Sequence, residues 1–487
     1  MRLALACAAS VAVLLVAAPA ASAAPACVLN GTTAEVTGEP EFVVVALEGV
    51  EIKALTSSGT FDCGAATTSN TDSVVVTAPP DVDVSATAAS VPLPGGATDE
   101  PGDTDEIEVT AVGYRTAYAL GAFGAPNTMS GGRLDDERLA ANLNAAAGDA
   151  DADLIVEGAA FLGLLGGNEA DVLSADGSAG TGAPWSTVDV YGEAGNDTLT
   201  AGGFLIGGGG DDSLTAVTGA GADPVVFYEG TGDVEVVLPG GTPPGKDGTG
   251  GTDTYVGVTQ VFTSGGDDKL TAGADAALLG GASGDDELAG GPGADALFDG
   301  TGDDTVTGGG GDDALAQHQS VANGADVLRG GDGFDRVYYG ASGVLQTGEA
   351  AFNGRTEPVF VTIGDGPNDG EADENDDVQA DVEYVRGGSG ADTLIGSEAG
   401  ERLAGLTGAD TVDGRGGVDL VQGDGADAEG LVDAGNVVIG GAGRDRLEGS
   451  EGPDDLRADD GDLDEVTCGA GIDFGPFDAI DVLTEDC

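Results

Sequence analysis

The sequence predicts an all-β fold, a parallel β-roll or β-solenoid with a disulfide-tied β cap at each end. Three observations predict it. Residues 290–316 read GGPGADALF DGTGDDTVT GGGGDDALA, which is one nine-residue pattern repeated three times. Bulky apolar material is scarce, because aromatic residues make up 5% of the chain and glycine 89 of its 487 residues. Apart from a cysteine in the N-terminal leader, the cysteines form one pair near each end.

The N-terminus predicts a secretory signal peptide over residues 1–23. Arg2 precedes an apolar run that ends at Val16, and small residues occupy positions 21–23 before the expected cleavage site. No later segment has the length of apolar sequence that a membrane-spanning helix needs. The mature protein is therefore expected to be secreted, without membrane insertion.

The charge of the chain restricts its partners. With 87 acidic and 16 basic side chains the formal net charge is -71. Such a chain repels nucleic acid and anionic membranes, so cations are the expected partners. A salt-adapted acidic surface would give a similar charge, but here the acids recur at one position of a repeat.

Four cysteines remain once Cys7 leaves with the leader: Cys27, Cys63, Cys468 and Cys487. The simplest pairing joins Cys27 to Cys63 and Cys468 to Cys487, and two other connectivities stay open. None lies in a CxxC motif, which argues against a thiolate metal site.

The N-terminal region is expected to begin with a β cap over residues 24–78, since EFVVVALEGVEIKAL and DSVVVTA flank Cys63. Residues 79–159 are expected to be a linker and degenerate solenoid coils; residues 79–106 have a linker-like composition, but a decayed solenoid is favoured from about residue 91 onward. RLDDERLAANLNAAAG, residues 133–148, is the one stretch with a helical pattern. The acidic stretches DADAD at 149–153 and NDGEADENDD at 368–377 lack the spacing of a helix-loop-helix calcium site and are expected to be solvated loops.

The repeat places Gly at the fourth position, Asp at the sixth and an aliphatic residue at the eighth. The aliphatic residues fall nine apart at Leu270, Leu279, Leu288, Leu297, Val306 and Leu315. Each unit therefore predicts a turn and a very short strand with one inward side chain. Consecutive units turn on opposite edges, so one coil takes two units and Asp286 is expected to stack on Asp304, and Asp295 on Asp313. The repeat forms three blocks, residues 160–222, 263–338 and 387–457.

The pattern GGxGxDxUx, with U aliphatic, resembles the hemolysin-type, or RTX, calcium-binding repeat. The resemblance implies that several Ca²⁺ ions lie between stacked turns, held by two carboxylates and turn carbonyls, because Ca²⁺ prefers hard oxygen ligands. It also implies that ion binding is coupled to folding. The metal-binding residues that it implies are Asp197, Asp212, Asp268, Asp286, Asp295, Asp304, Asp313, Asp326, Asp335, Asp392, Asp410, Asp419, Asp445 and Asp454, with the turn glycines Gly284, Gly293, Gly302 and Gly311.

A flexible linker and metal-free coils are the two alternatives for the repeat. A flexible Gly/Asp linker has no reason to keep an aliphatic residue at every ninth position. Metal-free coils are expected where the aspartate is missing, as around Ala277 and Glu401. Register slips, such as the thirteen-residue step from Asp313 to Asp326, are expected to interrupt the ladder of ions.

The segments between the blocks, residues 223–262 and 339–386, both read as strand, Asp/Gly-rich loop and short strand. We expect them to be solenoid coils with an outward loop. Residues 458–487 are expected to form a cap tied by Cys468 and Cys487, which would cover the last exposed strand edge.

The sequence predicts no enzyme. His318 is the one histidine, and neither an HExxH nor a GxSxG motif occurs. The favoured function is a secreted, calcium-binding structural protein with a surface or matrix partner. Two other hypotheses are an exported hydrolase with its active site in residues 24–160, and an adhesin that binds through the solenoid face.

Overall fold

The computed structural model describes the strands between residues 26 and 157 by their backbone, with side chains at Met129 and Ala141. It describes in full residues 161–177, 181, 183, 188–217, 224–238, 245–317, 324–339, 355–372, 374–424, 435–450, 452–484 and 487. The predicted signal peptide, the DADAD stretch and His318 lie outside these residues. Of the acidic stretch 368–377, the structure describes every residue but 373.

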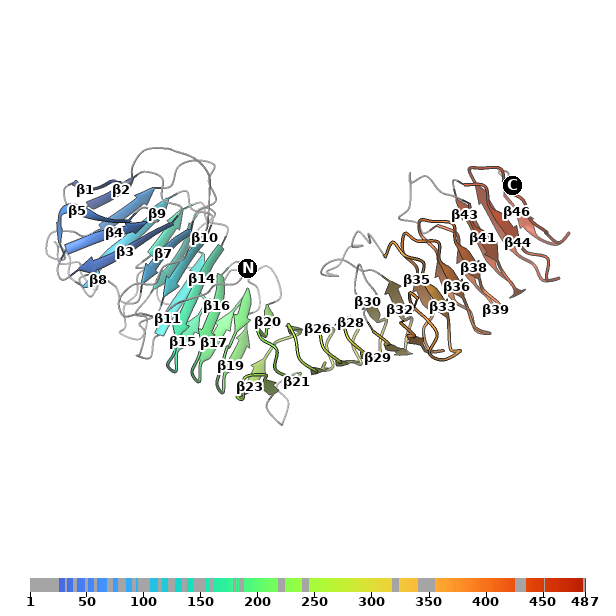
Figure 1. Cartoon of the computed structure of the whole chain (residues 1–487), viewed down its shortest axis with the longest axis horizontal. Coiled ribbons are helices and arrows are strands. Elements are labelled where there is room, and N and C mark those ends of the chain that lie inside the picture. The colour runs from blue at the N-terminus through green and yellow to red at the C-terminus, as the bar shows by residue number, and fades with distance from the viewer. Residues whose placement is uncertain are drawn as a thin grey trace. The chain divides into compact units, whose positions relative to one another are not determined.

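The chain divides into two compact units, residues 1–227 with 249–258, and residues 228–248 with 259–487. Every regular element among the described residues is a β-strand (Figure 1). In both units the strands stack in parallel rows, one coil after another. This arrangement confirms the predicted all-β solenoid.

The N-terminal part of the first unit contains antiparallel as well as parallel pairs. Antiparallel pairs are β1–β2, β3–β4, β4–β5, β8–β9, β11–β12 and β12–β13, whereas β6 pairs with β2 and β9 in parallel. The strands are β1 Ala26–Asn30, β2 Thr33–Thr37, β3 Phe42–Glu48, β4 Glu51–Thr56, β5 Gly59–Thr67, β6 Ser73–Thr77, β7 Ser85–Ala89, β8 Leu93–Pro94, β9 Glu106–Val112, β10 Thr116–Leu120, β11 Thr128–Arg133, β12 Arg138–Asn142 and β13 Leu154–Glu157.

The helix predicted for residues 133–148 was wrong. This stretch contains the end of β11 and all of β12, which pair antiparallel with Arg133 opposite Leu139. Pairing with β13 on the other side of β12 completes the hydrogen bonding of that strand. Tertiary pairing here overrides the helical preference of Leu and Ala, which is a weak local bias.

Two parallel rows continue the first unit. One row is β7, β10, β14 Phe161–Gly167, β16 Val188–Glu193, β18 Phe204–Ile206 and β20 Val225–Phe227. The other is β11, β15 Val172–Ser174, β17 Thr198–Ala201, β19 Ser213–Ala216 and β23 Thr252–Val256. Strand β7 belongs to this stack although it lies within residues 79–106, where the composition suggested a linker.

The second unit repeats this arrangement over more coils. Its first row is β24 Gln260–Phe262, β26 Leu278–Ser283, β28 Ala296–Thr301, β30 Ala314–Gln317, β32 Arg336–Tyr339, β35 Tyr384–Arg386, β37 Arg402–Ala404, β40 Leu420–Gln422, β43 Arg446–Ser450, β45 Glu465–Gly469 and β46 Val482–Leu483.

The facing row of the second unit has two parts. They are β21 Val234–Val237, β25 Lys269–Thr271, β27 Glu287–Gly291, β29 Thr305–Gly310, β31 Val327–Asp332 and β34 Asp377–Val378, then β33 Phe360–Thr362, β36 Thr393–Ile395, β38 Thr411–Asp413, β41 Val437–Ile439 and β44 Asp455–Arg457. Short strands β22 Gly245–Asp247, β39 Gly416–Gly417 and β42 Ala442–Gly443 complete the unit.

The coils keep a common register. Leu279 lies opposite Leu297, and Leu288 opposite Val306, so the chain returns to the same place after 18 residues, as at Asp286 and Asp304. Longer steps of the chain keep the same hydrogen bond between coils. The step from Asp304 to Asp326, for example, is 22 residues.

The core of each coil is thin. The eighth-position residues Leu279, Leu288, Leu297 and Leu315 are all 0% exposed, and each stacks on its counterpart in the next coil. Each half-coil therefore contributes little more than one aliphatic side chain to the interior, so burial of apolar surface per residue is low.

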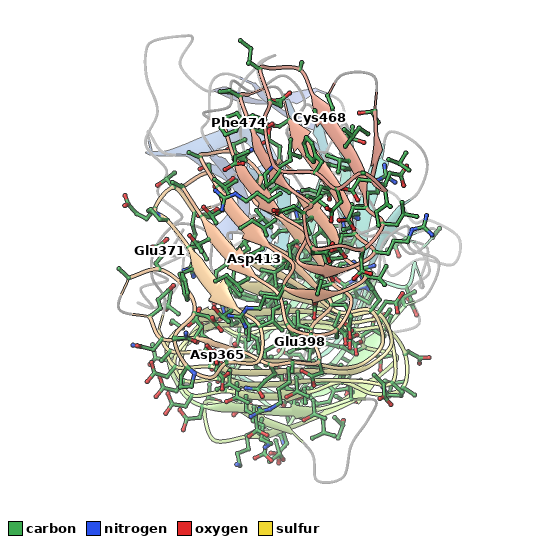
Figure 2. All side chains as sticks on the ribbon, turned by 90° about the vertical axis from the view of Figure 1, so that its right-hand side faces the viewer. Asp365, Glu371, Glu398, Asp413, Cys468 and Phe474 are labelled. Atoms are coloured by element: carbon green, nitrogen blue, oxygen red, sulfur yellow. A yellow bond between two sulfur atoms is a disulfide. The ribbon has the colours of Figure 1, made fainter. Side chains whose placement is uncertain are left out.

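The C-terminal disulfide joins Cys468 to Cys487, with 5.1 Å between their Cα atoms, and confirms that predicted pair. Cys468 lies in β45, and Figure 2 labels it together with Phe474, which belongs to the last coils. The expected pairing of Cys27 with Cys63 involves side chains outside those the structure describes.

Removal of one core side chain tests the stacking. Leu297→Ala should destabilise the second unit by about 2–5 kcal/mol, because it leaves a cavity between two coils. The matched control is Val418→Ala, since Val418 is 69% exposed. Denaturant unfolding of both variants in calcium measures the difference; equal stabilities would contradict the stacked core.

Candidate metal sites at the turns

The sixth-position aspartates lie in the turns, two residues before the core aliphatic residue. All fourteen aspartates predicted as metal ligands are at most 3% exposed. A carboxylate at such a place would face solvent in an ordinary turn, so its burial requires partners that replace water.

Backbone amides of the preceding coil supply the first partner. The amide of Asp268 donates to Oδ1 of Asp286 at 2.7 Å, and the amide of Asp286 donates to Oδ1 of Asp304 at 2.7 Å. The other edge repeats this bond from Asp295 to Asp313 at 2.8 Å. Each aspartate thus fixes the turn of the coil before it.

The same bond joins the remaining predicted residues. In the first unit the amides of Asp197 and Asp212 donate to Asp212 and Asp253. In the second unit the ladder includes Asp304 to Asp326, Asp313 to Asp335, Asp392 to Asp410, Asp419 to Asp445, and Asn436 to Asp454. These amide-to-carboxylate bonds therefore continue across the longer steps of the chain, while an interruption of the ladder of ions stays a prediction.

The second carboxylate oxygen, Oδ2, points toward the first glycine of its own unit. A Cβ added to Gly290 would lie 2.5 Å from Oδ2 of Asp295 and 2.1 Å from the carbonyl oxygen of Gly308 in the next coil. At Gly308 a Cβ would lie 2.4 Å from Oδ2 of Asp313. The first position is thus glycine because carboxylate and carbonyl oxygens converge on it.

Within the described residues, several of these Oδ2 atoms are buried and accept no hydrogen bond, including those of Asp286, Asp295, Asp304 and Asp313. For Asp286, Asp295 and Asp313, a Cβ on the first glycine of the unit would meet both this Oδ2 atom and a carbonyl oxygen of the next coil. Oxygen atoms alone, with no donor among them, are the ligand set that a hard cation such as Ca²⁺ takes.

The fourth-position glycines let the turns stack closely. Gly284, Gly302 and Gly311 have φ values of 132°, 138° and 115°, a region that favours glycine. A Cβ on Gly302 would lie 1.9 Å from the carbonyl oxygen of Gly284. Gly293 lacks a positive φ, but there a Cβ would lie 2.7 Å from the amide nitrogen of Ala276.

Burial opposes ionisation of these acids. Desolvation, together with the charge of neighbouring aspartates, raises the pKa of Asp286 to about 7 and that of Asp304 to about 8. In the first unit desolvation likewise raises the pKa of Asp197 to about 7. Without a cation, these groups favour their protonated form near neutral pH.

The coils that lack aspartate keep the same backbone. The amide of Ala277 donates to Oδ1 of Asp295 at 2.6 Å, and the amide of Glu401 donates to Oδ1 of Asp419 at 2.8 Å. Glu401 itself accepts a hydrogen bond from the Ser397 hydroxyl. These positions therefore belong to the stack although they depart from the repeat.

The acidic stretch at 368–377 is not the solvated loop that was expected. Asp369, Glu374 and Asp376 are at most 2% exposed. Asp369 accepts the amides of Thr362 and Val378, and Asp376 accepts the amide of Asp326. Asp376 thus occupies a sixth-position site in the ladder, which the irregular sequence conceals.

Further members of the ladder were missed in the sequence. Asp171 accompanies Asp197, and Asp464 accepts the amide of Asp445. Both precede an aliphatic residue by two positions, and that short signal could have found them. Fifth-position aspartates form an exposed outer ladder as well, in which the amides of Asp285 and Asp303 donate to Asp267 and Asp285.

Comparison with known families supports the pattern. The model of the RTX calcium-binding nonapeptide repeat matches residues 189–203, 280–315, 322–341, 380–399, 395–427 and 433–462. No curated protein matches the chain. Nowhere in the described part is there a helix long and apolar enough to cross a membrane. The matched segments lie in both units and contain most of the aspartate ladder, so these parts of the chain are hemolysin-type, RTX calcium-binding repeats.

Proposed function

We propose that the protein is exported and that Ca²⁺ binds between stacked turns, where it drives folding of the solenoid. The observation that carries this proposal is the set of buried Oδ2 atoms without hydrogen-bond partners, each beside a turn carbonyl. The ligands are the sixth-position aspartates of the repeat blocks 160–222, 263–338 and 387–457. Turn carbonyls, including those of Gly284, Gly293, Gly302 and Gly311, complete each site.

The folded chain then has a structural, non-catalytic role, with a surface or matrix partner outside the cell. Secretion is supported by the predicted leader and by the disulfide at the C-terminus, which is typical of oxidising compartments. In this proposal, residues 24–78 and 458–487 cap the two ends of the stack. Folding follows export, because calcium is plentiful outside the cell.

The reason that folding needs the ion lies in the charge of the turns. The aspartates that stack on each edge repel one another, and each has lost its water. The aliphatic core is thin and cannot offset both costs together with the loss of backbone entropy. A divalent cation at the Oδ2 atoms removes the repulsion and replaces the missing water.

Neutralising one ligand tests the site. Asp286→Asn keeps an oxygen for the backbone bond but removes a charge, so calcium affinity at that turn should fall about tenfold or more. Asp275→Asn is the matched control, because Asp275 is exposed in the same block. Calorimetric titration with Ca²⁺, with Mg²⁺ for comparison, measures the loss; identical isotherms for the two variants would contradict the proposal.

The first-position glycine can be tested in the same way. Gly308→Ala should weaken calcium binding and destabilise the loaded protein by about 1–3 kcal/mol, because its Cβ meets Oδ2 of Asp313. Gly310→Ala is the control, since a Cβ there finds no atom closer than 3.8 Å. Thermal unfolding in calcium compares them, and an equal effect of both substitutions would show that the first position has no special role.

The pH dependence should reverse with calcium. Asp286 and Asp304 have pKa values raised from 3.8 to about 7 and about 8, so in the calcium-free protein the stability due to protonation is present below pH 3.8 and is lost as the pH rises through 7 to 8. Calcium binding requires the ionised form and releases protons, so the loaded protein should gain stability over this interval.

Melting curves at about pH 5 and about pH 8, with a chelator or with calcium, measure this prediction. The chelated protein should melt at a lower temperature at the higher pH, and the loaded protein at a higher temperature. A chelated protein that becomes more stable toward pH 8 would contradict the role of the buried acids.

A further inference from the structure

One unit of the repeat departs from the pattern at its first position. The unit DGTGDDTVT begins with Asp299, where the units on either side begin with glycine. Asp299 lies two residues after Leu297 on the inward face of β28 and is 1% exposed. A charged side chain therefore enters the interior where the other coils leave room for oxygen atoms.

Asp299 is followed in the next two coils by other polar residues at the equivalent place. Phe298 pairs with Ala316, so Asp299 stacks on Gln317, and Gln317 pairs with Tyr339. Both residues carry an N–H or O–H group, although Nε2 of Gln317 makes no hydrogen bond among the described residues. The Tyr339 hydroxyl donates to Oδ2 of Asp376 at 3.3 Å, and the Gln317 side chain lowers the pKa of Asp326 against the larger effect of burial.

Asp299 has no such donor to offer. Its Oδ1 accepts the amide of Gly300 at 2.6 Å. Neither its Oδ2 nor that of Asp304 finds a hydrogen-bond partner anywhere in the described ranges. The charged groups that act on Asp299 are themselves acids, Asp326, Asp304 and Asp376.

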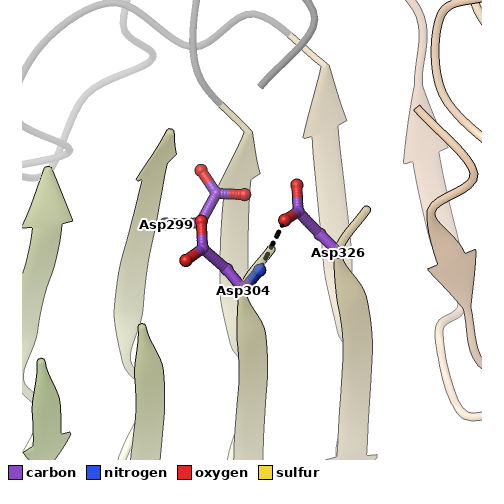
Figure 3. Close-up of side chains that lie close together, drawn as sticks. All are labelled: Asp299, Asp304 and Asp326. Carbon is purple, nitrogen blue, oxygen red and sulfur yellow. Dashed lines mark hydrogen bonds between the residues drawn. The ribbon is translucent and has the colours of Figure 1, made fainter. Parts of the chain in front are cut away.

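The three carboxylates come together in the interior. One oxygen from each of Asp299, Asp304 and Asp326 lies within 4.8 Å of the other two, and all three residues are buried (Figure 3). The carboxylates of Asp299 and Asp304 are adjacent in this view, and Asp326 bonds to the amide of Asp304. Within the described part of the chain, no other acidic group of this size is arranged so closely.

We propose that Asp299, Asp304 and Asp326 form a three-carboxylate cation site that binds Ca²⁺ more tightly than the regular turns. The inference rests on the proposed function and adds to it a site that the repeat pattern does not contain. A regular turn offers two sixth-position carboxylates, whereas this one offers a third from a first-position side chain. The affinity of oxygen sites for Ca²⁺ rises with ligand charge, and burial strengthens the attraction.

The competing explanation is a shared proton. Two of the carboxyl groups could hold one proton between them, as paired acids do when no cation is present. Asp299 would then be a tolerated defect of the repeat. The two explanations differ when Asp299 is replaced by glycine, which turns the unit into the regular GGTGDDTVT. A cation site then loses its tightly bound ion, whereas a shared proton leaves the number of tightly bound ions unchanged.

Two variants of the mature chain test the site, Asp299→Gly and Asp299→Asn, with Asp275→Asn as control. Calcium titration in competition with a chelator of known affinity should show one ion in the wild type that binds about tenfold or more tightly than the rest. Both Asp299 variants should lose that tight ion and keep the others. Circular dichroism in calcium verifies that each variant is folded.

The outcomes separate the two proposals. A wild type that binds Ca²⁺ while both Asp299 variants retain the same number of tight ions overturns the three-carboxylate site alone and favours the shared proton. A wild type that binds no Ca²⁺ at any turn overturns the proposed function and this site together. A tight ion lost in Asp299→Gly and Asp299→Asn, but not in Asp275→Asn, supports the assignment.

Discussion

The structure depends on the burial of a carboxylate at most turns of the stack. The amide-to-Oδ1 bond, repeated from Asp268 through Asp286 to Asp304, holds each coil to the next. It is a charge-assisted bond in a place without water, so it is strong only while the acid remains ionised. Desolvation and like charges both oppose that ionised state. The requirement for a countercharge therefore arises from the turns, and the thin aliphatic core cannot remove it.

The glycine content follows from the same constraint. A first-position side chain at Gly290 or Gly308 would occupy the space that Oδ2 and the next carbonyl share. A fourth-position side chain at Gly302 would meet the carbonyl oxygen of Gly284 and would strain a backbone with φ of 138°. The glycines recur every nine residues because the carboxylate and carbonyl oxygens that need this space also recur every nine residues. Glycine loses more conformational entropy on folding than other residues, and this loss adds to the free energy that ion binding offsets in the proposed function.

The sequence predicted the regular parts of the molecule well, because one period carries both structure and chemistry. The 18-residue return and the stacking of Asp286 on Asp304 follow from the alternation of turns alone. Asp376 could not be found in this way, because its unit keeps the aspartate and the aliphatic residue but has lost the glycines. The sequence did not predict that both edges lengthen together, to 22 residues from Asp304 to Asp326 and from Asp313 to Asp335, with the hydrogen bonds between coils kept. Asp267, Asp285 and Asp303 form the exposed outer ladder through hydrogen bonds between successive coils. The pattern of residues within one nine-residue unit does not reveal such bonds.

The irregular segment between the second and third blocks shows how the constraint is met without the repeat. Arg355 is 0% exposed there, and its guanidinium donates to Glu374 and Gln317. It also opposes the raised pKa of Asp376, whereas the neighbours that act on Asp286 are aspartates. A side-chain cation thus accompanies buried acids where the nonapeptide is lost. Where the nonapeptide is kept, the chain supplies carboxylate and carbonyl oxygens, and in the proposed function the countercharge is Ca²⁺ from solution.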